Sequence, residues 1–121
     1  MALVLCTGID PVLLKTRRLI LERAGHKVVG TTDEAALLAA CKKHSFDVAV
    51  IGQTVGIKMK RHISALIREH CPGIRILELY REFQGKALDD ADSWLETPAD
   101  IPKDLADHVD ELVARNKKAG A

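Results

Sequence analysis

The chain has 121 residues, which fits one domain that can bury roughly two-thirds of its unfolded surface without disulfides or metals. Its apolar fraction of 47% and charged fraction of 29% are those of an ordinary soluble globular protein. A net charge of +1 excludes a global attraction to nucleic acid or anionic membranes, and no apolar run approaches the roughly 20 residues that span a bilayer.

The N-terminal stretch and the cysteines indicate a compartment. MALVLCTGIDP has no basic segment and reaches a polar break too early for a secretory signal, so the expected location is the cytoplasm. Cys6, Cys41 and Cys71 are odd in number, widely spaced and embedded in apolar or helical patterns. We therefore expect three reduced structural thiols. The five histidines show no ligand spacing, so no metal site is expected.

Taken in order, the chain alternates short apolar runs with helical patterns. Asp10 is a suitable N-cap and Pro11 a suitable first residue for the first helix, which ends at Gly25. Thr31 and Glu34 have the spacing of a capping box before the second helix. The predicted strands cover residues 2–6, 27–31, 47–51, 74–79 and 93–96. The predicted helices cover about 11–24, 33–44, 58–70, 82–89 and 101–116.

This alternation predicts a doubly wound α/β sandwich around a five-stranded parallel sheet. We expect a single domain over residues 1–121, with its core at about 3–115 and a frayed tail at 117–121. The unbroken apolar run at 48–51 predicts a central strand covered on both faces. Ligands of such sheets bind beyond the carboxyl ends of the strands, and the residue there is Gly52, which has no side chain.

Three segments together resemble the receiver domain of two-component response regulators. They are Asp10-Pro11 after the first strand, FDVAVI at 46–51, and ADSWLETP at 91–98, which is similar to the family pattern A-D-D-Y-L-x-K-P. The resemblance covers about residues 3–115. It implies a flavodoxin-like (βα)5 fold with strand order 2-1-3-4-5 and a cis bond at Thr97-Pro98.

The family transfers a phosphoryl group from a histidine kinase to an aspartate after the third strand. An acidic pair holds Mg²⁺, and a hydroxyl residue and a lysine stabilise the transferred charge. Carried onto this chain, these positions are Gly8 and Ile9 for the acidic pair, Gly52 for the nucleophile, Tyr80 for the hydroxyl, with a shift towards Glu78 left open, and Thr97 for the lysine. All five are replaced, so the resemblance predicts a pseudo-receiver without Mg²⁺ or phosphorylation.

The expected function is therefore non-enzymatic signalling by protein–protein interaction. The resemblance implies a kinase, phosphotransfer domain or output domain as partner, and a homodimer is left open. Trp94 occupies the family's aromatic switch position, where Tyr80 would block its inward swing. Trp94 is either an interface anchor or a residue that packs against the C-terminal helix. A decayed receiver without a role also stays open.

Basic residues suggest an alternative. Lys58, Lys60 and Arg61, followed by His62, gather at the start of the third helix, either as an anion site or as a solvated loop. The anion site would make the chain a small-anion or nucleotide sensor that uses the loop above Gly52. A second alternative is an active phosphoreceiver with a displaced acceptor. The cluster Lys15, Arg17 and Arg18 is expected to be a solvated face.

Overall fold

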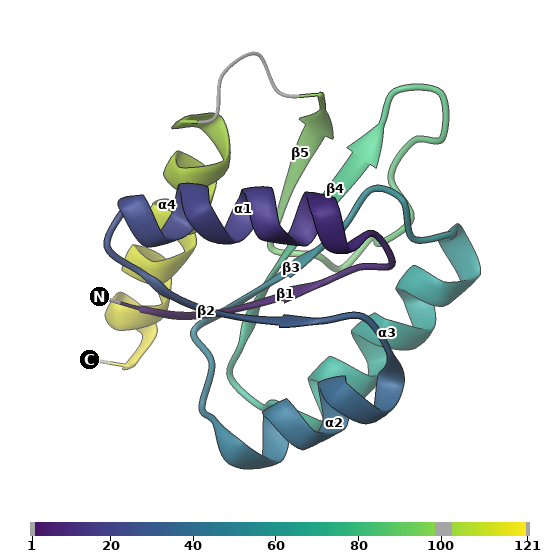
Figure 1. The fold of residues 1–121 in the computed structure, drawn as a ribbon. Coiled ribbons are helices and arrows are strands. Elements are labelled where there is room, and N and C mark those ends of the chain that lie inside the picture. Colours follow the sequence, from purple (N-terminus) through teal and green to yellow (C-terminus); the bar gives the residue numbers. More distant parts are fainter. Residues whose placement is uncertain (1, 99–102, 121) are drawn as a thin grey trace.

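The computed structural model describes residues 2–98 and 103–120, which form one five-stranded parallel sheet between two pairs of helices (Figure 1). The strand order is β2-β1-β3-β4-β5, so the predicted fold class and sheet order are confirmed. The strands are β1 (Leu3–Thr7), β2 (Lys27–Thr31), β3 (Val48–Ile51), β4 (Arg75–Arg81) and β5 (Ser93–Thr97). The helices are α1 (Pro11–Arg23), α2 (Glu34–Lys43), α3 (Ile57–His70) and α4 (Lys103–Gly120).

Two apolar cores lie on opposite faces of the sheet. Helices α1 and α4 cover one face, and α2 and α3 cover the other (Figure 1). Side chains along β3 alternate between them: Val48 and Val50 join the first core, and Ala49 and Ile51 join the second. This double covering explains why β3 is apolar without interruption.

The helix caps agree with the sequence at α1 and differ at α2. Asp10 accepts hydrogen bonds from the backbone N–H of Val12 at 2.9 Å and of Leu13 at 3.4 Å, as predicted for an N-cap. The predicted capping box of Thr31 and Glu34 is wrong, because Thr31 is the last residue of β2. Asp33 caps α2 instead and accepts from the N–H of Ala36 at 2.8 Å.

The helix predicted at 82–89 is also wrong, since two turns, at 82–84 and 89–90, and irregular segments connect β4 to β5. The carboxylate of Glu78 accepts hydrogen bonds from the backbone N–H of Ala87 and of Leu88, at 2.8 Å and 2.9 Å. These amides are thereby bound to a side chain of β4 and not to helical carbonyls. Leu88 packs into the α3-side core, so the loop itself covers the face where a fifth helix was expected.

The C-terminal helix is longer than predicted. Its predicted start at residues 101 and 102 lies outside the described residues. The frayed tail predicted at 117–121 is wrong for 117–120, whose backbone continues α4. The sequence from Lys117 to Ala119 holds good helix formers and no breaker, which is consistent with this extension. No helix in the described part of the chain combines the length and apolar character needed to cross a membrane.

The expectation of three reduced thiols is wrong for two of the cysteines. Cys41 in the last turn of α2 and Cys71 at the C-cap of α3 form a disulfide, with their Cα atoms 5.5 Å apart. The bridge forms because the ends of these two neighbouring helices meet, which their separation of 30 residues in sequence does not reveal. Cys6 is a buried thiol within the first core.

Candidate functional site: a receiver-like edge with a buried arginine

The carboxyl ends of β1 and β3 bring two of the predicted positions together. The N–H of Gly52 donates to the carbonyl of Thr7 at 2.9 Å. A Cβ built on Gly52 would lie 3.7 Å from the Cα of Gly8, so the two glycines are in contact. Ile9 follows in the loop, with an exposed side chain. The structure therefore assembles the edge at which the family's acidic pair and nucleophile would stand.

Arg17 of α1 points into this edge, contrary to the prediction that it belongs to a solvated face. Its side chain is buried, and its Nη1 lies 2.9 Å from the position that a Cβ on Gly52 would take. Its Nη2 donates to the side-chain oxygen of Gln53. Lys15 and Arg18 are exposed, as predicted for a solvated face. The guanidinium thus occupies the space into which an acceptor side chain at position 52 would extend.

The burial of Arg17 has electrostatic consequences for its neighbourhood. Desolvation lowers the pKa of Arg17, while the nearby Cys6 and Asp10 raise it. Desolvation in the core raises the pKa of Cys6 to about 12, and the positive charge of Arg17 opposes that increase. The Cys6 thiol is therefore protonated at neutral pH.

The residues at this edge do not fit a divalent cation. Mg²⁺ requires carboxylate or other oxygen ligands, and Gly8, Ile9 and Gly52 have no side-chain oxygen. The carboxylate of Asp10 is engaged in capping α1. Within residues 2–98 and 103–120, no group of three or more His, Cys, Asp or Glu side chains has the arrangement of a metal site. A buried guanidinium beside Gly52 opposes cation binding further.

The ends of β4 and β5 hold the other two replaced positions. The hydroxyl of Thr97 donates to the carbonyl of Tyr80 at 3.2 Å, so it links the two strands. The Thr97-Pro98 bond is cis, which confirms the prediction. Glu78, the alternative left open for the hydroxyl position, is completely buried and engaged with the loop that follows β4.

Lys60 does not contribute to an anion site as the sequence suggested. Its Nζ lies 2.9 Å from a carboxylate oxygen of Glu78 and donates to the carbonyl of Leu79 at 2.7 Å. The side chains of Lys60 and Glu78 are 2% and 0% exposed. Lys58 is exposed, and Arg61 donates through Nε to the carbonyl of Ala87 at 3.3 Å. The three residues therefore do not converge on one point.

The packing predicted for Trp94, against the C-terminal helix, is wrong, because Trp94 faces the other side of the sheet from α4. It is half-buried against the α3-side core, and its Nε1 donates to the carbonyl of Leu88 at 2.9 Å. The ammonium of Lys86 lies 4.7 Å from the centre of the Trp94 ring and 5.8 Å from that of Tyr80. Lys86 thus lies over both aromatic rings.

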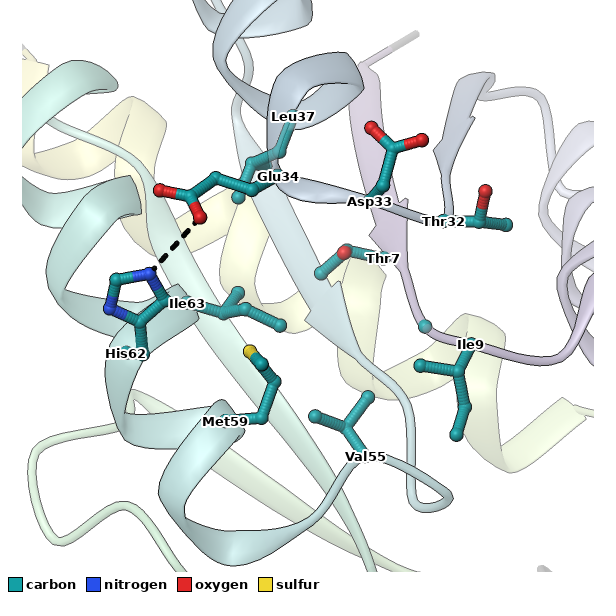
Figure 2. A pocket seen from close by; sticks show the side chains of 11 residues that line it. Thr7, Ile9, Thr32, Asp33, Glu34, Leu37, Val55, Met59, His62 and Ile63 are labelled. Atoms are coloured by element: carbon teal, nitrogen blue, oxygen red, sulfur yellow. Dashed lines mark ion pairs between the residues drawn. The ribbon is translucent and has the colours of Figure 1, made fainter.

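A pocket of about 280 Å³ opens beside the two glycines, between α2 and α3 (Figure 2). Five of the ten side chains that line it are apolar, and apolar atoms form most of its surface. Glu34 and His62 form an ion pair of 3.4 Å across it. Sequence analysis did not find this pocket. The only signal was the helical spacing of Met59 and Ile63, which a buried face produces equally well. The apolar lining is Ile9, Leu37, Val55, Met59 and Ile63.

Comparisons with known proteins extend these observations. No protein-family model matches the chain, and no curated protein matches it in sequence. Solved structures do match. A response regulator receiver modulated diguanylate cyclase from Pelobacter carbinolicus shares 14% identity with a TM-score of 0.77, over 99% of this chain and 98% of that one. A CheY-like response regulator receiver domain protein from Methanospirillum hungatei shares 17% identity with a TM-score of 0.78, over 96% and 97%.

NtrX from Brucella abortus, solved in complex with ADP, shares 15% identity with a TM-score of 0.84 over 98% of this chain. The match covers only 27% of that chain, so the present chain corresponds to one part of that larger protein. At sequence identities this low, the structural similarity establishes the fold alone. The chain therefore has the fold of response regulator receiver domains.

Proposed function

We propose that this chain is a receiver-like signalling module of the two-component type that binds protein partners and does not accept a phosphoryl group. The observation that carries the proposal is the buried guanidinium of Arg17, placed against Gly52 where an acceptor carboxylate would extend. Phosphoryl transfer to an aspartate requires the carboxylate itself and a metal ion that neutralises the transferred charge. The residues at this edge supply neither.

A displaced acceptor is not favoured by the carboxylates around the edge. Asp10 and Asp33 cap α1 and α2, and Glu78 is buried against Lys60. Each of these carboxylates is held by amide or ammonium donors, which stabilise the carboxylate and lower its nucleophilicity.

The small-anion sensor also loses support. Of the two lysines expected at the loop above Gly52, Lys60 is buried in its ion pair with Glu78, and Lys58 is exposed and does not line the pocket. The side chains that line the neighbouring pocket include Asp33 and Glu34 and no Lys or Arg. An anion there would meet two carboxylates.

The proposed partner is a histidine kinase, a phosphotransfer domain or an output domain. Support comes from the similar structures, since one is a response regulator receiver modulated diguanylate cyclase and another matches over only part of a longer chain. A homodimer is the alternative.

The cytoplasm is the expected location for such a pathway. The Cys41–Cys71 disulfide argues against this location, because disulfides are rare in reducing compartments.

Phosphorylation is tested by incubating the chain with acetyl phosphate and Mg²⁺ and measuring its intact mass. A phosphorylation-competent receiver domain in the same buffer is the positive control. We expect no phosphoryl adduct on this chain under conditions that modify the control. An adduct mapped to any carboxylate at the edge, for example Asp10, would contradict the proposal.

The interaction is tested with candidate partners encoded beside this gene, captured by the immobilised chain. Trp94→Ala should abolish capture if Trp94 anchors the interface. The control is Leu95→Ala, because the Leu95 side chain packs into the core on the opposite face of the sheet and its truncation also removes buried apolar surface. Equal loss of capture by both variants, with equal loss of stability, would show that Trp94 only supports the fold.

A further inference from the structure

The pocket beside the two glycines lies where the topology of the sheet leaves a crevice. From β1 the chain crosses to β2 on one side, and the next strand, β3, pairs on the other side of β1. The loops after β1 and β3 therefore diverge, and such switch points are the usual ligand sites of open α/β sheets. Here Gly8 and Ile9 from the first loop and Val55 from the second line the pocket, with α2 and α3 as its outer walls (Figure 2).

Most of the surface that lines this pocket is apolar, including parts that are open to solvent. Ile9 is 60% exposed and Met59 is 51% exposed, and both line it. Leu37 and Val55 are buried beneath them. Exposed apolar side chains around a hollow are characteristic of ligand sites. An apolar cavity of about 150 Å³ binds benzene, so the 280 Å³ of this pocket accommodates one aromatic ring system with a short chain.

The charges around the pocket select the polar group of the ligand. The ionisable lining residues are Asp33, Glu34 and His62, two carboxylates against one imidazole. Glu34 and His62 pair across the mouth at 3.4 Å, and both side chains are exposed enough to move. The carboxylates favour a positively charged ligand. The N-terminus of α3 at Gly56, which has no side-chain cap, acts in the opposite direction and favours negative charge. An anionic analogue of the ligand is therefore the necessary control.

From the volume, the apolar walls and the two carboxylates, we infer that this pocket binds a small aromatic amine, with its ring between Ile9 and Met59 and its ammonium at Glu34. The inference does not depend on the proposed signalling role, because it rests only on the shape and the lining of the pocket. It would add a small-molecule input to the fold.

Tryptamine is the probe, and binding is followed by amide shifts in ¹⁵N–¹H NMR spectra. Tryptophol, its neutral analogue, and indole-3-propionate, its anionic analogue, are the controls. Saturable shifts confined to the loop after β1 and the first turns of α2 and α3 are expected with tryptamine. Because exposed charge pairs contribute little, tryptophol should bind roughly two- to fivefold more weakly, and the propionate more weakly still.

Two variants locate the site. Glu34→Gln should weaken tryptamine about two- to fivefold and leave tryptophol unchanged. Met59→Trp should fill the pocket and abolish binding of both, whereas Leu19→Trp, at a similarly exposed position on α1 outside the pocket, should not. The inference is overturned if tryptamine causes no saturable shifts at the pocket, if Met59→Trp binds normally, or if either control ligand binds as tightly as tryptamine.

Discussion

Replacing Lys60 with methionine should destabilise the protein strongly. Methionine keeps most of the apolar stem and removes the ammonium that lies 2.9 Å from Glu78 and 2.7 Å from the carbonyl of Leu79. The carboxylate of Glu78, which is 0% exposed, then stays buried with only the backbone N–H groups of Ala87 and Leu88 as donors. Breaking one side of such a pair costs about 3–5 kcal/mol.

This free energy converts to a large change in melting temperature. Unfolding entropies near 2.1 cal/mol/K per residue give about 0.25 kcal/mol/K for 121 residues. The Lys60→Met variant should therefore melt roughly 12–20 °C below the parent, measured by circular dichroism. Lys58→Met is the control, because Lys58 is exposed and its replacement should change the free energy of unfolding by less than about 0.5 kcal/mol.

A second substitution separates charge from packing. Glu78→Gln in the Lys60→Met background removes the unpaired charge and keeps an oxygen for the amides of Ala87 and Leu88. We expect it to restore about 1–3 kcal/mol of the loss. A Lys60→Met variant that melts within a few degrees of the parent would refute the buried ion pair, as would a double variant less stable than the single one.

Three further predictions concern the edge of the sheet and the cysteines. Gly52→Asp should fold, because the group nearest its new Cβ, at 2.9 Å, is the flexible end of Arg17. It should still resist acetyl phosphate, since the loop after β1 supplies no metal-binding carboxylates, and a phosphoryl adduct on intact mass would contradict this. Reducing the Cys41–Cys71 bridge, which spans 30 residues, should cost about 3–4 kcal/mol and lower the melting temperature by roughly 12–16 °C, with alkylation and mass confirming reduction. Because its pKa is raised to about 12, Cys6 should not react with iodoacetamide in the folded protein at neutral pH, and rapid labelling would show that the thiol is accessible as thiolate.

The sequence by itself determined the strands and their coverage. Local sequence patterns carry this information. Strand β3 is apolar on both of its faces because helices cover both faces of the sheet, and Asp10-Pro11 begins α1 without any partner distant in sequence. The resemblance carried the sheet order and the replaced positions, and Gly8 and Gly52 indeed meet at one edge.

The tertiary structure alone decided what fills that edge and what surrounds it. Arg17 is buried because Gln53, 36 residues away, and the space left by Gly52 receive its guanidinium. Lys60 is buried because Glu78 lies beneath it on another strand, and Glu78 in turn keeps the next segment from becoming a helix. A basic residue on a helix has the same local pattern whether it faces water or a distant carboxylate, so only the packing of the whole chain distinguishes the two.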